Sequence, residues 1–522
     1  MKESKPVIEH YDVIIVGAGP TGLTLACDLA RRGLKIRIID ASSEAFKGSR
    51  GKGIQPRTLE VFDNLGIAEP ILRAGDKYSP MGIHLSFLKI KWRMIKLHKK
   101  TPEVPYPNTW LVPQWRTEEV LRNRLKELGH SIEYNSRVFA IEQDETDVSI
   151  QVNFNGEYTT LRSRYLVGAD GGKSFVRKNL GVNFSGVTSQ EGRMIVGDIR
   201  VDGLSRDCWH VWPKSKGGLV GLCPIPHSDL FQLMMKLPTS EENPELSEAA
   251  IQARWIASTG LKNIRLHSPA WLSVFRPNVR LVEKYRVGRV FLAGDAAHIH
   301  TPAGAQGLNT GVQDAFNLGW KLALALGGAP ESILDTYEEE RKPVAAGVLK
   351  LSSERFKSIG ENRISKPTRG DEERQLLLNY RSSSITKGPG PLRKNKLAAG
   401  DRAPDAICSN RISGRTSLFD AFRGGHFTLL VFGSHATNKI RAANWQSNNL
   451  MKVFSIERDT SSNDSNVLFD DSGKIQKTYG VTGNESITFL VRPDGYIAHM
   501  ATGEWRKEIQ SYFTNITGYP LT

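Results

Sequence analysis

The 522-residue chain has only four cysteines, and no two of them have the CxxC spacing of a zinc or redox site. So few scattered cysteines are typical of reduced thiols in the cytoplasm rather than of a disulfide framework. We therefore expect neither disulfide bonds nor a bound metal ion. The cysteines are Cys27, Cys208, Cys223 and Cys408.

Long hydrophobic runs are also missing. No stretch approaches the roughly 18 apolar residues that a membrane span requires; the apolar run at 320–329 is short. The polar first ten residues lack the apolar centre of a secretion signal. These absences predict a cytoplasmic protein that has no membrane partner.

Acidic residues are fewer than basic ones, 55 against 70, which gives a formal net charge of +15. The bases are spread along the chain apart from one dense run at 91–100, and no nucleic-acid-binding motif accompanies them. We therefore expect no nucleic-acid partner. A positive field would instead help to attract anionic nucleotides.

A glycine-rich turn follows the first predicted strand. The apolar run 11–16 is typical of a parallel strand buried on both faces, and a helix is predicted over 23–32. In the G-x-G-x-x-G motif between them, Gly17 permits a tight turn, Gly19 lets the backbone approach a pyrophosphate, and Gly22 lets helix and strand pack closely. The helix N-terminus would attract the phosphates. The motif therefore predicts a dinucleotide site, with contacts from Gly17, Gly19, Pro20, Thr21 and Gly22.

A second predicted strand, 35–39, ends at Asp40. A carboxylate at this point can accept hydrogen bonds from ribose hydroxyls, which favours a nucleotide with a free 2′-hydroxyl. The dinucleotide is then FAD or NAD rather than NADP, and the opening of the chain does not choose between them.

Two later segments make that choice. Residues 164–177, RYLVGADGGKSFVR, resemble the "DG" motif of FAD-dependent aromatic hydroxylases, and residues 288–311 closely resemble their "GD" motif. With the glycine turn, all three motifs stand in the family's order. Over residues 8–350 the chain thus resembles single-component flavoprotein monooxygenases of the p-hydroxybenzoate hydroxylase fold.

The resemblance implies FAD as cofactor, NADPH or NADH as reductant and O₂ as co-substrate. A flavin C4a-hydroperoxide would then transfer one oxygen atom to an aromatic, phenolic or polyketide-like small molecule. Other flavin reactions stay open: Baeyer–Villiger oxygenation, antibiotic inactivation or dehydrogenation. A FAD-binding ligand sensor without turnover is a further alternative.

The resemblance also assigns roles to individual residues. Asp295, after Gly294, would hydrogen-bond the ribityl chain of FAD, and Arg50 would lie near its phosphates. Gln114, and less clearly Arg116, would lie on a helix entering the flavin site, although either arginine could be a surface ion-pair residue instead. The loop facing the flavin ring would comprise Pro302, Gly304, Gly307, Leu308 and Asn309.

The "DG" segment would serve both FAD and NAD(P)H, through Asp170 and Arg177. No second complete G-x-G-x-x-G unit is present, which agrees with transient binding of the reductant. His298 and His300 have no third partner for a metal ion, so structural roles beside the loop are favoured for both. No catalytic base can be named.

Alternating runs within 78–112 and 184–280 predict half-buried antiparallel strands. In the family such a sheet binds the substrate over the flavin. Trp209 and Trp212 are candidates for stacking against a flat ligand, although core packing explains aromatic strands equally well. Six tryptophans fall in or beside these runs: Trp92, Trp110, Trp209, Trp212, Trp255 and Trp271.

The expected fold is α/β: a Rossmann-type FAD-binding domain, an inserted mixed or antiparallel sheet domain, and a C-terminal domain resembling the thioredoxin-like domain of phenol hydroxylases. That last domain lacks CxxC, so a structural role or a contact in a homodimer is favoured over disulfide exchange. The predicted segments are 1–77, 113–183 and 281–350 for FAD binding, 78–112 and 184–280 for the inserted sheet, 351–397 for a helix and linker, and 398–522 for the C-terminal domain.

Overall fold

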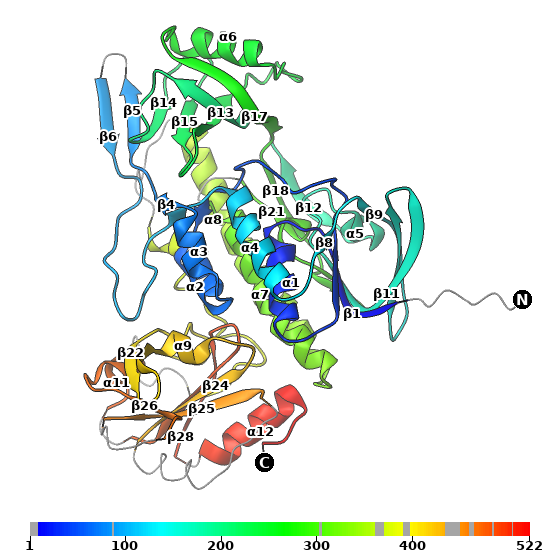
Figure 1. The fold of residues 1–522 in the computed structure, drawn as a ribbon, viewed down its shortest axis with the longest axis vertical. Coiled ribbons are helices and arrows are strands. Elements are labelled where there is room, and N and C mark those ends of the chain that lie inside the picture. The colour runs from blue at the N-terminus through cyan, green and yellow to red at the C-terminus, as the bar shows by residue number, and fades with distance from the viewer. Residues whose placement is uncertain are drawn as a thin grey trace, which may run out of the picture.

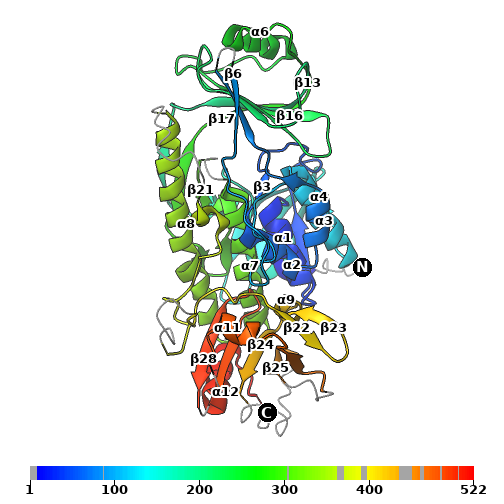
Figure 2. The same cartoon turned by 90° about the vertical axis from the view of Figure 1, so that its left-hand side faces the viewer.

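The computed structural model describes residues 9–85, 88–301, 305–360, 370–389, 397–433, 449–458, 464–482, 485–503 and 505–521. The chain forms an elongated molecule whose three large sheets follow one another along the long axis (Figure 1). The sheet that contains the first strands lies in the middle, with a second sheet at one end and the C-terminal sheet at the other (Figure 2).

The central sheet has eight strands: β1 (His10–Val16), β2 (Ile36–Ile39), β8 (Ile132–Glu133), β9 (Ser136–Gln143), β10 (Val148–Phe154), β11 (Glu157–Gly168), β19 (Arg286–Val287) and β20 (Val290–Leu292). Strands β20-β11-β1-β2-β8 run parallel, and β9 and β10 extend β11 as antiparallel neighbours. Val13, Ile14 and Ile15 are fully buried, because both faces of β1 are covered.

Helix α1 (Pro20–Ala30) packs against both α4 (Gln114–Glu127) and α7 (Gly307–Leu326) beside this sheet. Helix α1 begins earlier than the predicted residue 23, because Pro20 fits the first turn of a helix, where no N–H is needed. No helix within the described ranges is both long and apolar enough to span a bilayer. The shorter helices of this region are α2 (Pro56–Asn64), α3 (Ala68–Arg73) and α5 (Phe175–Asn179).

A seven-stranded sheet forms the upper end of the molecule in Figure 1. Across the sheet the order is β17 (Arg265–Phe275), β13 (Met194–Asp202), β16 (Leu230–Lys236), β15 (Val220–Pro224), β14 (Trp209–Trp212), β5 (Met81–Leu85) and β6 (Leu88–Trp92). Only the β14–β5 pairing is parallel. Helix α6 (Glu248–Thr259) closes a core that contains Trp212 and Trp255.

Two small sheets connect the larger ones. One consists of β12 (Phe184–Thr188), β18 (Asn278–Val282) and β21 (His298–Ile299), and the other of β3 (Gly53–Ile54), β4 (Asp76–Lys77) and β7 (Trp110–Leu111). Each joins chain segments that lie far apart in the sequence.

The C-terminal sheet is mixed, in the order β23 (Gly414–Ser417), β22 (Ile407–Asn410), β26 (Val467–Phe469), β25 (Met451–Glu457), β24 (Phe427–Phe432), β27 (Ile487–Val491) and β28 (Ile497–Thr502). Within the described ranges the helices of this domain are α9 (Leu418–Phe422), α11 (Lys474–Tyr479) and α12 (Trp505–Thr517). Strands β24, β25 and β26 are mutually parallel, while β27 and β28 are antiparallel. The thioredoxin-like description stays a prediction. All four cysteines are buried free thiols.

Helix α8 (Ser332–Gly360) runs along the molecule as one helix (Figure 2) and includes Pro343. The predicted linker packs closely where it is described, at 370–389. Tyr380 is 4% exposed and its hydroxyl accepts a hydrogen bond from Arg341 at 2.9 Å. The Lys387 N–H donates to the Ala498 carbonyl at 3.0 Å, so this segment fastens the C-terminal domain.

Candidate active site

The glycine turn between β1 and α1 has the geometry needed to receive a phosphate group. Gly17 has a φ of +105°, and a side chain there would overlap the backbone of Ala169. A side chain at Gly22 would overlap the Gly17 carbonyl oxygen. At Gly19, the N-cap of α1, no atom of the described residues lies within 4 Å of the position of a Cβ. The positive end of α1 therefore points at a position that an anion can occupy.

Asp40 lies beside this turn, as predicted from its place after β2. Its carboxylate accepts hydrogen bonds from the N–H of Ala18 at 2.7 Å and from the N–H and hydroxyl of Ser42 at 2.8 and 2.6 Å. These bonds fix the turn and the carboxylate together. A hydrogen bond from a ribose to Asp40 stays a prediction.

The loop that follows residue 48 is fixed by the upper sheet. Buried Asp198 on β13 accepts hydrogen bonds from the Ser49 N–H at 2.7 Å and the Trp271 Nε1–H at 2.5 Å. Gln232 on β16 donates to the Ser49 hydroxyl at 2.7 Å. This buried cluster therefore determines where the next residue, Arg50, can lie.

Gly51 brings two of the predicted flavin-site residues together. Its N–H donates to Oε1 of Gln114 at 3.2 Å, and a Cβ on Gly51 would lie 3.3 Å from Cδ1 of Leu308. Gln114 is the first residue of α4 and Leu308 lies in the first turn of α7. Three segments that are distant in sequence therefore meet here.

Arg50 and Asp295 are both exposed, and their charges interact. The Arg50 guanidinium lies 4.5 Å from the ring centroid of Phe46 and carries no ion pair among the described residues. Asp295 likewise has no hydrogen-bond partner among the described residues. The Asp295 side chain is open to solvent but lies in a hollow with many protein atoms around it, and this partial desolvation raises its pKa. The charges of His298 and Arg50 oppose the rise. An accessible carboxylate without a partner suits a ligand that offers hydroxyl groups.

The "DG" segment is held in place by its own polar residues. Oδ2 of Asp170 accepts hydrogen bonds from the N–H groups of Phe175 and Val176 at 2.7 and 3.1 Å, while its Oδ1 is buried without a partner among the described residues. Burial raises the pKa of Asp170, and these hydrogen bonds oppose the rise. The remaining oxygen can accept one more hydrogen bond.

Arg177 lies deeper than a surface nucleotide-binding residue. It is 4% exposed, and its guanidinium donates to the carbonyls of Ala296 and Gly172 at 2.8 and 2.9 Å. These contacts tie the "DG" segment to the "GD" segment. The predicted contact with NAD(P)H stays a prediction, and in this structure Arg177 holds two loops together.

The N-terminal turn of α7 is fixed by Asn309, which is fully buried. Its amide donates to the carbonyls of Gly53 and Ala305 at 2.7 Å each, and its oxygen accepts from the Gln55 N–H at 2.8 Å. Its side chain is therefore committed to the protein, and only its backbone can face a ligand. Gly307 begins α7. Pro302 and Gly304, the other residues predicted for this loop, lie outside the described residues.

His298 and His300 both have structural surroundings. Nε2 of His298 is 2.6 Å from Oδ2 of Asp314, and both residues are fully buried. Burial and, to a smaller extent, the charge of His298 together lower the pKa of His300 to about 4. The His300 ring contacts the start of α7, near Gly307. The favoured interpretation of structural histidines agrees with these contacts.

One group in the described ranges has the spacing of metal ligands: Asp207, Cys208 and His210. Its atoms are already engaged, because Nε2 of His210 lies 2.8 Å from the Ser205 carbonyl and Asp207 forms an ion pair with Lys91. Two nearby lysines also oppose a cation there. The group carries no argument for a metal site.

The two predicted substrate tryptophans differ in their surroundings. Trp212 is 8% exposed, and its ring centroid lies 4.2 Å from that of stacked His84 and 5.0 Å from that of Trp255, which it meets edge-on. It therefore belongs to the core between the upper sheet and helix α6. Trp209 is half-buried, with the Lys52 ammonium 4.4 Å from its ring centroid. Of the two, Trp209 is the one whose surroundings leave it able to face a ligand.

Arg116 forms an ion pair with Glu119 at 2.7 Å and lies over the Trp115 ring. This is the surface alternative that the sequence leaves open, and its contact with FAD stays a prediction.

Sequence reasoning predicts no role for Ser49, Asp198 or Lys52. Only the run Gly51–Gly53, with a lysine between two glycines, marks Lys52 as unusual, whereas nothing local links Ser49 to a strand 149 residues away.

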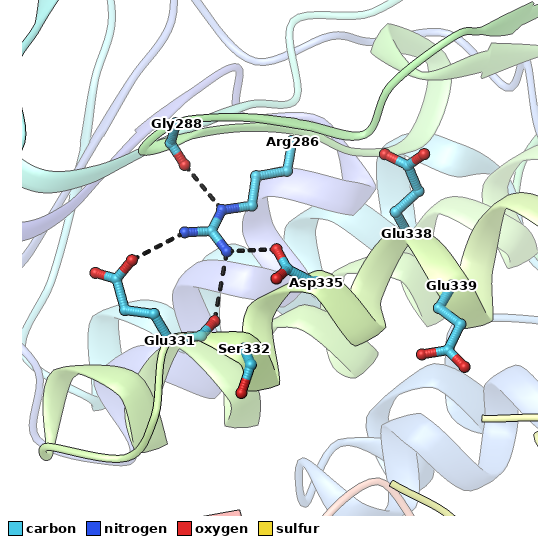
Figure 3. Close-up of a pocket in the computed structure, with 7 residues that line it drawn as sticks. All are labelled: Arg286, Gly288, Glu331, Ser332, Asp335, Glu338 and Glu339. Carbon is cyan, nitrogen blue, oxygen red and sulfur yellow. Dashed lines mark hydrogen bonds and ion pairs between the residues drawn. The ribbon is translucent and has the colours of Figure 1, made fainter. Parts of the chain in front are cut away.

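A concavity between β19 and α8 is lined by Arg286, Gly288, Glu331, Ser332, Asp335, Glu338 and Glu339 (Figure 3). The Arg286 guanidinium donates to Asp335 at 2.7 Å and to Glu331 at 3.2 Å, so its charge is already paired. None of the predicted site residues lines it. This acidic hollow is separate from the candidate site.

The described residues fit FAD. The helix N-terminus at Gly19 can bind the pyrophosphate, Asp295 can accept hydrogen bonds from a polyol chain, and Arg50 and Gln114 lie at the same site. The fold and the site together define a dinucleotide-binding flavoprotein.

Family models identify the class more closely. Residues 10–352 match the family described as FAD binding domain, and residues 396–520 match the one described as aromatic-ring hydroxylase, C-terminal. The chain belongs to the family of FAD-dependent aromatic hydroxylases, which confirms the resemblance seen in its motifs.

Individual relatives agree over nearly the whole chain. A flavin-dependent monooxygenase from Mycobacteroides abscessus is 43% identical over 499 residues, which cover 94% of this chain and 96% of the relative. The 12-dehydrotetracycline 5-monooxygenase/anhydrotetracycline 6-monooxygenase of Streptomyces rimosus is 32% identical, with coverage of 95% and 96%. The structure of aklavinone-11 hydroxylase with FAD and aklavinone matches with a TM-score of 0.82 at 25% identity, covering 98% of this chain and 100% of that one. The chain is a FAD-dependent monooxygenase of the aromatic hydroxylase type.

Glu118 on α4 should make stability at this site depend on pH. Burial raises its pKa from 4.5 to about 7, and a hydrogen bond from Gln114 opposes the rise. Between pH 4.5 and 7 the unfolded chain has released the proton that the folded chain still holds. The stability of the folded protein therefore falls as pH rises through this range, by about 3 kcal/mol in total. We expect Glu118→Gln to gain stability relative to the parent from pH 4.5 to 7, measured by urea unfolding. The neighbouring Glu119, whose side chain is 41% exposed, provides a control, Glu119→Gln. Equal pH slopes in E118Q and the parent would contradict the assignment.

Proposed function

We propose that the protein uses NADPH or NADH to reduce its FAD and inserts one oxygen atom of O₂ into a fused-ring aromatic or polyketide-like small molecule. When bound, the flavin supplies the redox and oxygen chemistry, and the protein positions the ring and excludes water. The flavin–oxygen adduct expected from the resemblance, a cytoplasmic location and a homodimer belong to this proposal.

One observation carries the proposal: the first turn of α1 and the loop that contains Asp295 come together, since a Cβ on Gly294 would lie 2.5 Å from Oγ1 of Thr21. The open N-terminus of α1 at Gly19 offers N–H donors to the pyrophosphate of FAD. The carboxylate of Asp295, which has no partner among the described residues, offers an acceptor to its ribityl hydroxyls. The adjoining loop at Ser49 is hydrogen-bonded to the upper sheet through Asp198. This hydrogen bond supports a short distance between the loop proposed to contact FAD and the sheet proposed to bind substrate.

The substrate class is supported by two relatives. The Streptomyces rimosus enzyme is a monooxygenase of 12-dehydrotetracycline and anhydrotetracycline, and the aklavinone-11 hydroxylase structure holds aklavinone. These ligands are fused-ring compounds, and both proteins match nearly the whole chain. The test is to purify the flavin-loaded protein, supply NADPH or NADH, and measure nucleotide oxidation with and without anhydrotetracycline and other fused-ring phenols. We expect a fused-ring ligand to accelerate oxidation and a product heavier by one oxygen atom from isotopically labelled O₂.

The same assay separates the other reactions. Dehydrogenation would give a product that has lost two hydrogen atoms, and Baeyer–Villiger oxygenation would give the same mass gain with an ester in the nuclear magnetic resonance spectrum. Antibiotic inactivation would appear as loss of antibacterial activity of the oxygenated product. A yellow protein that oxidises NADPH or NADH at the same rate with every ligand would favour a sensor and refute the proposal.

Asp295→Ala is expected to weaken FAD binding by about tenfold or more, because the ribityl hydroxyls would lose a charged acceptor. Titration of the apoprotein with FAD, followed by flavin fluorescence, gives the affinity. Asp295→Asn, which keeps an oxygen acceptor, should lose less. A fully yellow Asp295→Ala protein with the parental affinity would remove Asp295 from the cofactor site.

A further inference from the structure

Lys52 lies where the loop that follows residue 48 meets the upper sheet. Its carbonyl oxygen accepts a hydrogen bond from the Val112 N–H at 2.8 Å, and the next residue begins β3. The preceding residue, Gly51, contacts Gln114 and Leu308 of the candidate flavin site. The Lys52 side chain reaches the other way, to the ring of Trp209 on β14, with its ammonium 4.4 Å from the ring centroid.

The ammonium of Lys52 is buried and has no hydrogen-bond partner among the described residues. Asp198 interacts with its charge, but that carboxylate is already bound by Ser49 and Trp271. The Nε1–H of Trp209 is a second buried donor without a partner in the described ranges. Two unused donors, one of them charged, therefore lie side by side.

The surroundings of these donors are mostly apolar. Tyr78, Leu111 and Cys223 form a buried cluster against which Trp209 packs. A buried charge is normally paired, and contact with an aromatic face replaces only part of the hydration that an ammonium loses. The missing partner should therefore be an anionic oxygen on a flat, otherwise apolar ligand. The flexible four-carbon stem of lysine can follow such an oxygen from the Trp209 face.

We infer that Lys52 is a specificity residue that binds the ionised ring or enol hydroxyl of the substrate, so that the enzyme prefers acidic polyphenols over their ethers. The inference rests on the proposed function, since it places this oxygen on the molecule to be oxygenated. The hydroxyl proton leaves to solvent and Lys52 stays protonated. The negative charge left on the ring system makes its carbons richer in electrons, which favours transfer of an electrophilic oxygen.

The test uses alizarin, a flat three-ring diphenol whose visible colour changes when a hydroxyl ionises, and its dimethyl ether, which cannot ionise. Both are titrated into the oxidised, FAD-loaded protein without reductant, at a pH equal to the pKa of the free dye. Because no turnover occurs, the result does not depend on oxygenase activity. The titration gives the affinity, and the absorption spectrum gives the ionised fraction of the bound dye.

In the parent protein, we expect bound alizarin to be almost wholly ionised and to bind more tightly than the ether. Lys52→Met should weaken alizarin binding by about 10- to 100-fold, leave the ether within about twofold, and bring the ionised fraction down to half or less. Lys52→Arg should keep most of the ionisation. Lys47→Met, which removes an exposed lysine five residues earlier in the same segment, should change neither ligand.

Three results would overturn the inference. The parent protein could bind alizarin no more tightly than the ether, or Lys52→Met could weaken both ligands equally, which would indicate a packing role. Lys52→Met could also shift the midpoint potential of FAD while alizarin binding stays unchanged. The ammonium would then interact with the flavin and not with the substrate. The proposed function fails separately, if no ligand stimulates NADPH or NADH oxidation in the parent.

Discussion

Gly19→Thr is expected to lower FAD affinity by about two orders of magnitude, about 3 kcal/mol, with little change in the stability of the protein without cofactor. Threonine and glycine are similar as N-cap residues, and the extended backbone of Gly19 (φ −76°, ψ −176°) accepts a side chain. No described atom lies where the new Cβ would stand. The side chain would instead occupy the space predicted for the pyrophosphate. FAD titration of the apoprotein and a thermal unfolding curve give the two quantities.

Two other glycines provide the contrast. Gly22→Ala should lower the unfolding temperature as well as FAD binding, because its Cβ would overlap the Gly17 carbonyl oxygen. Gly347→Ala, at an exposed position in α8 with no described atom within 4 Å of the new Cβ, should leave FAD binding unchanged. If Gly19→Thr bound FAD like the parent, the pyrophosphate would not lie at this turn.

Arg492→Met is expected to destabilise the protein by about 3–5 kcal/mol, because it removes the cation that pairs with buried Asp494 and leaves buried Glu340 with Lys321 alone. The Arg492 guanidinium donates to both oxygens of Glu340 at 2.6 and 2.9 Å and also bonds Asp494. Burial alone would raise the pKa of Glu340, but the charges of Arg492 and Lys321 hold it well below its usual range. Since Glu340 lies on α8 and Arg492 follows β27, the loss should first loosen the C-terminal domain. Urea unfolding and limited proteolysis would show both effects.

The double variant Glu340→Gln/Arg492→Met should lose less stability than the two single variants added together, because one change removes the charge that the other leaves unpaired. Arg381→Met, which removes a half-exposed ion pair with Asp401, should cost at most about 1 kcal/mol. Equal effects of Arg381→Met and Arg492→Met would contradict the importance given to the buried pair.

Local sequence predicted the nucleotide-binding opening well. The glycines of the turn act through backbone angles and close approaches within a few residues, and those follow from residue type and spacing alone. Gly17, Gly22 and Asp40 lie where their pattern places them. The family motifs add the cofactor, because three of them in order leave little room for coincidence.

The direction in which a side chain points was harder to predict from sequence than the backbone turn. Arg177 and Asn309 occur in the expected segments, but the structure buries both and commits their polar groups to neighbouring loops. Trp212 packs in the core of the upper domain, whereas Trp209, only three residues earlier, faces Lys52. An alternating pattern shows that two faces exist and does not say which face meets a ligand.

The amino-acid sequence by itself determined the parallel nucleotide-binding core, the order of its motifs and the family. Only the packing of the folded chain holds Ser49 at Asp198 and fastens the C-terminal domain through α8 and the segment after it. It also leaves Lys52 against Trp209 with no hydrogen-bond partner in the described part of the chain. The reason is physical: backbone conformation depends on near neighbours, whereas the partner of a buried charge or amide is fixed by the packing of sheets that join residues hundreds of positions apart.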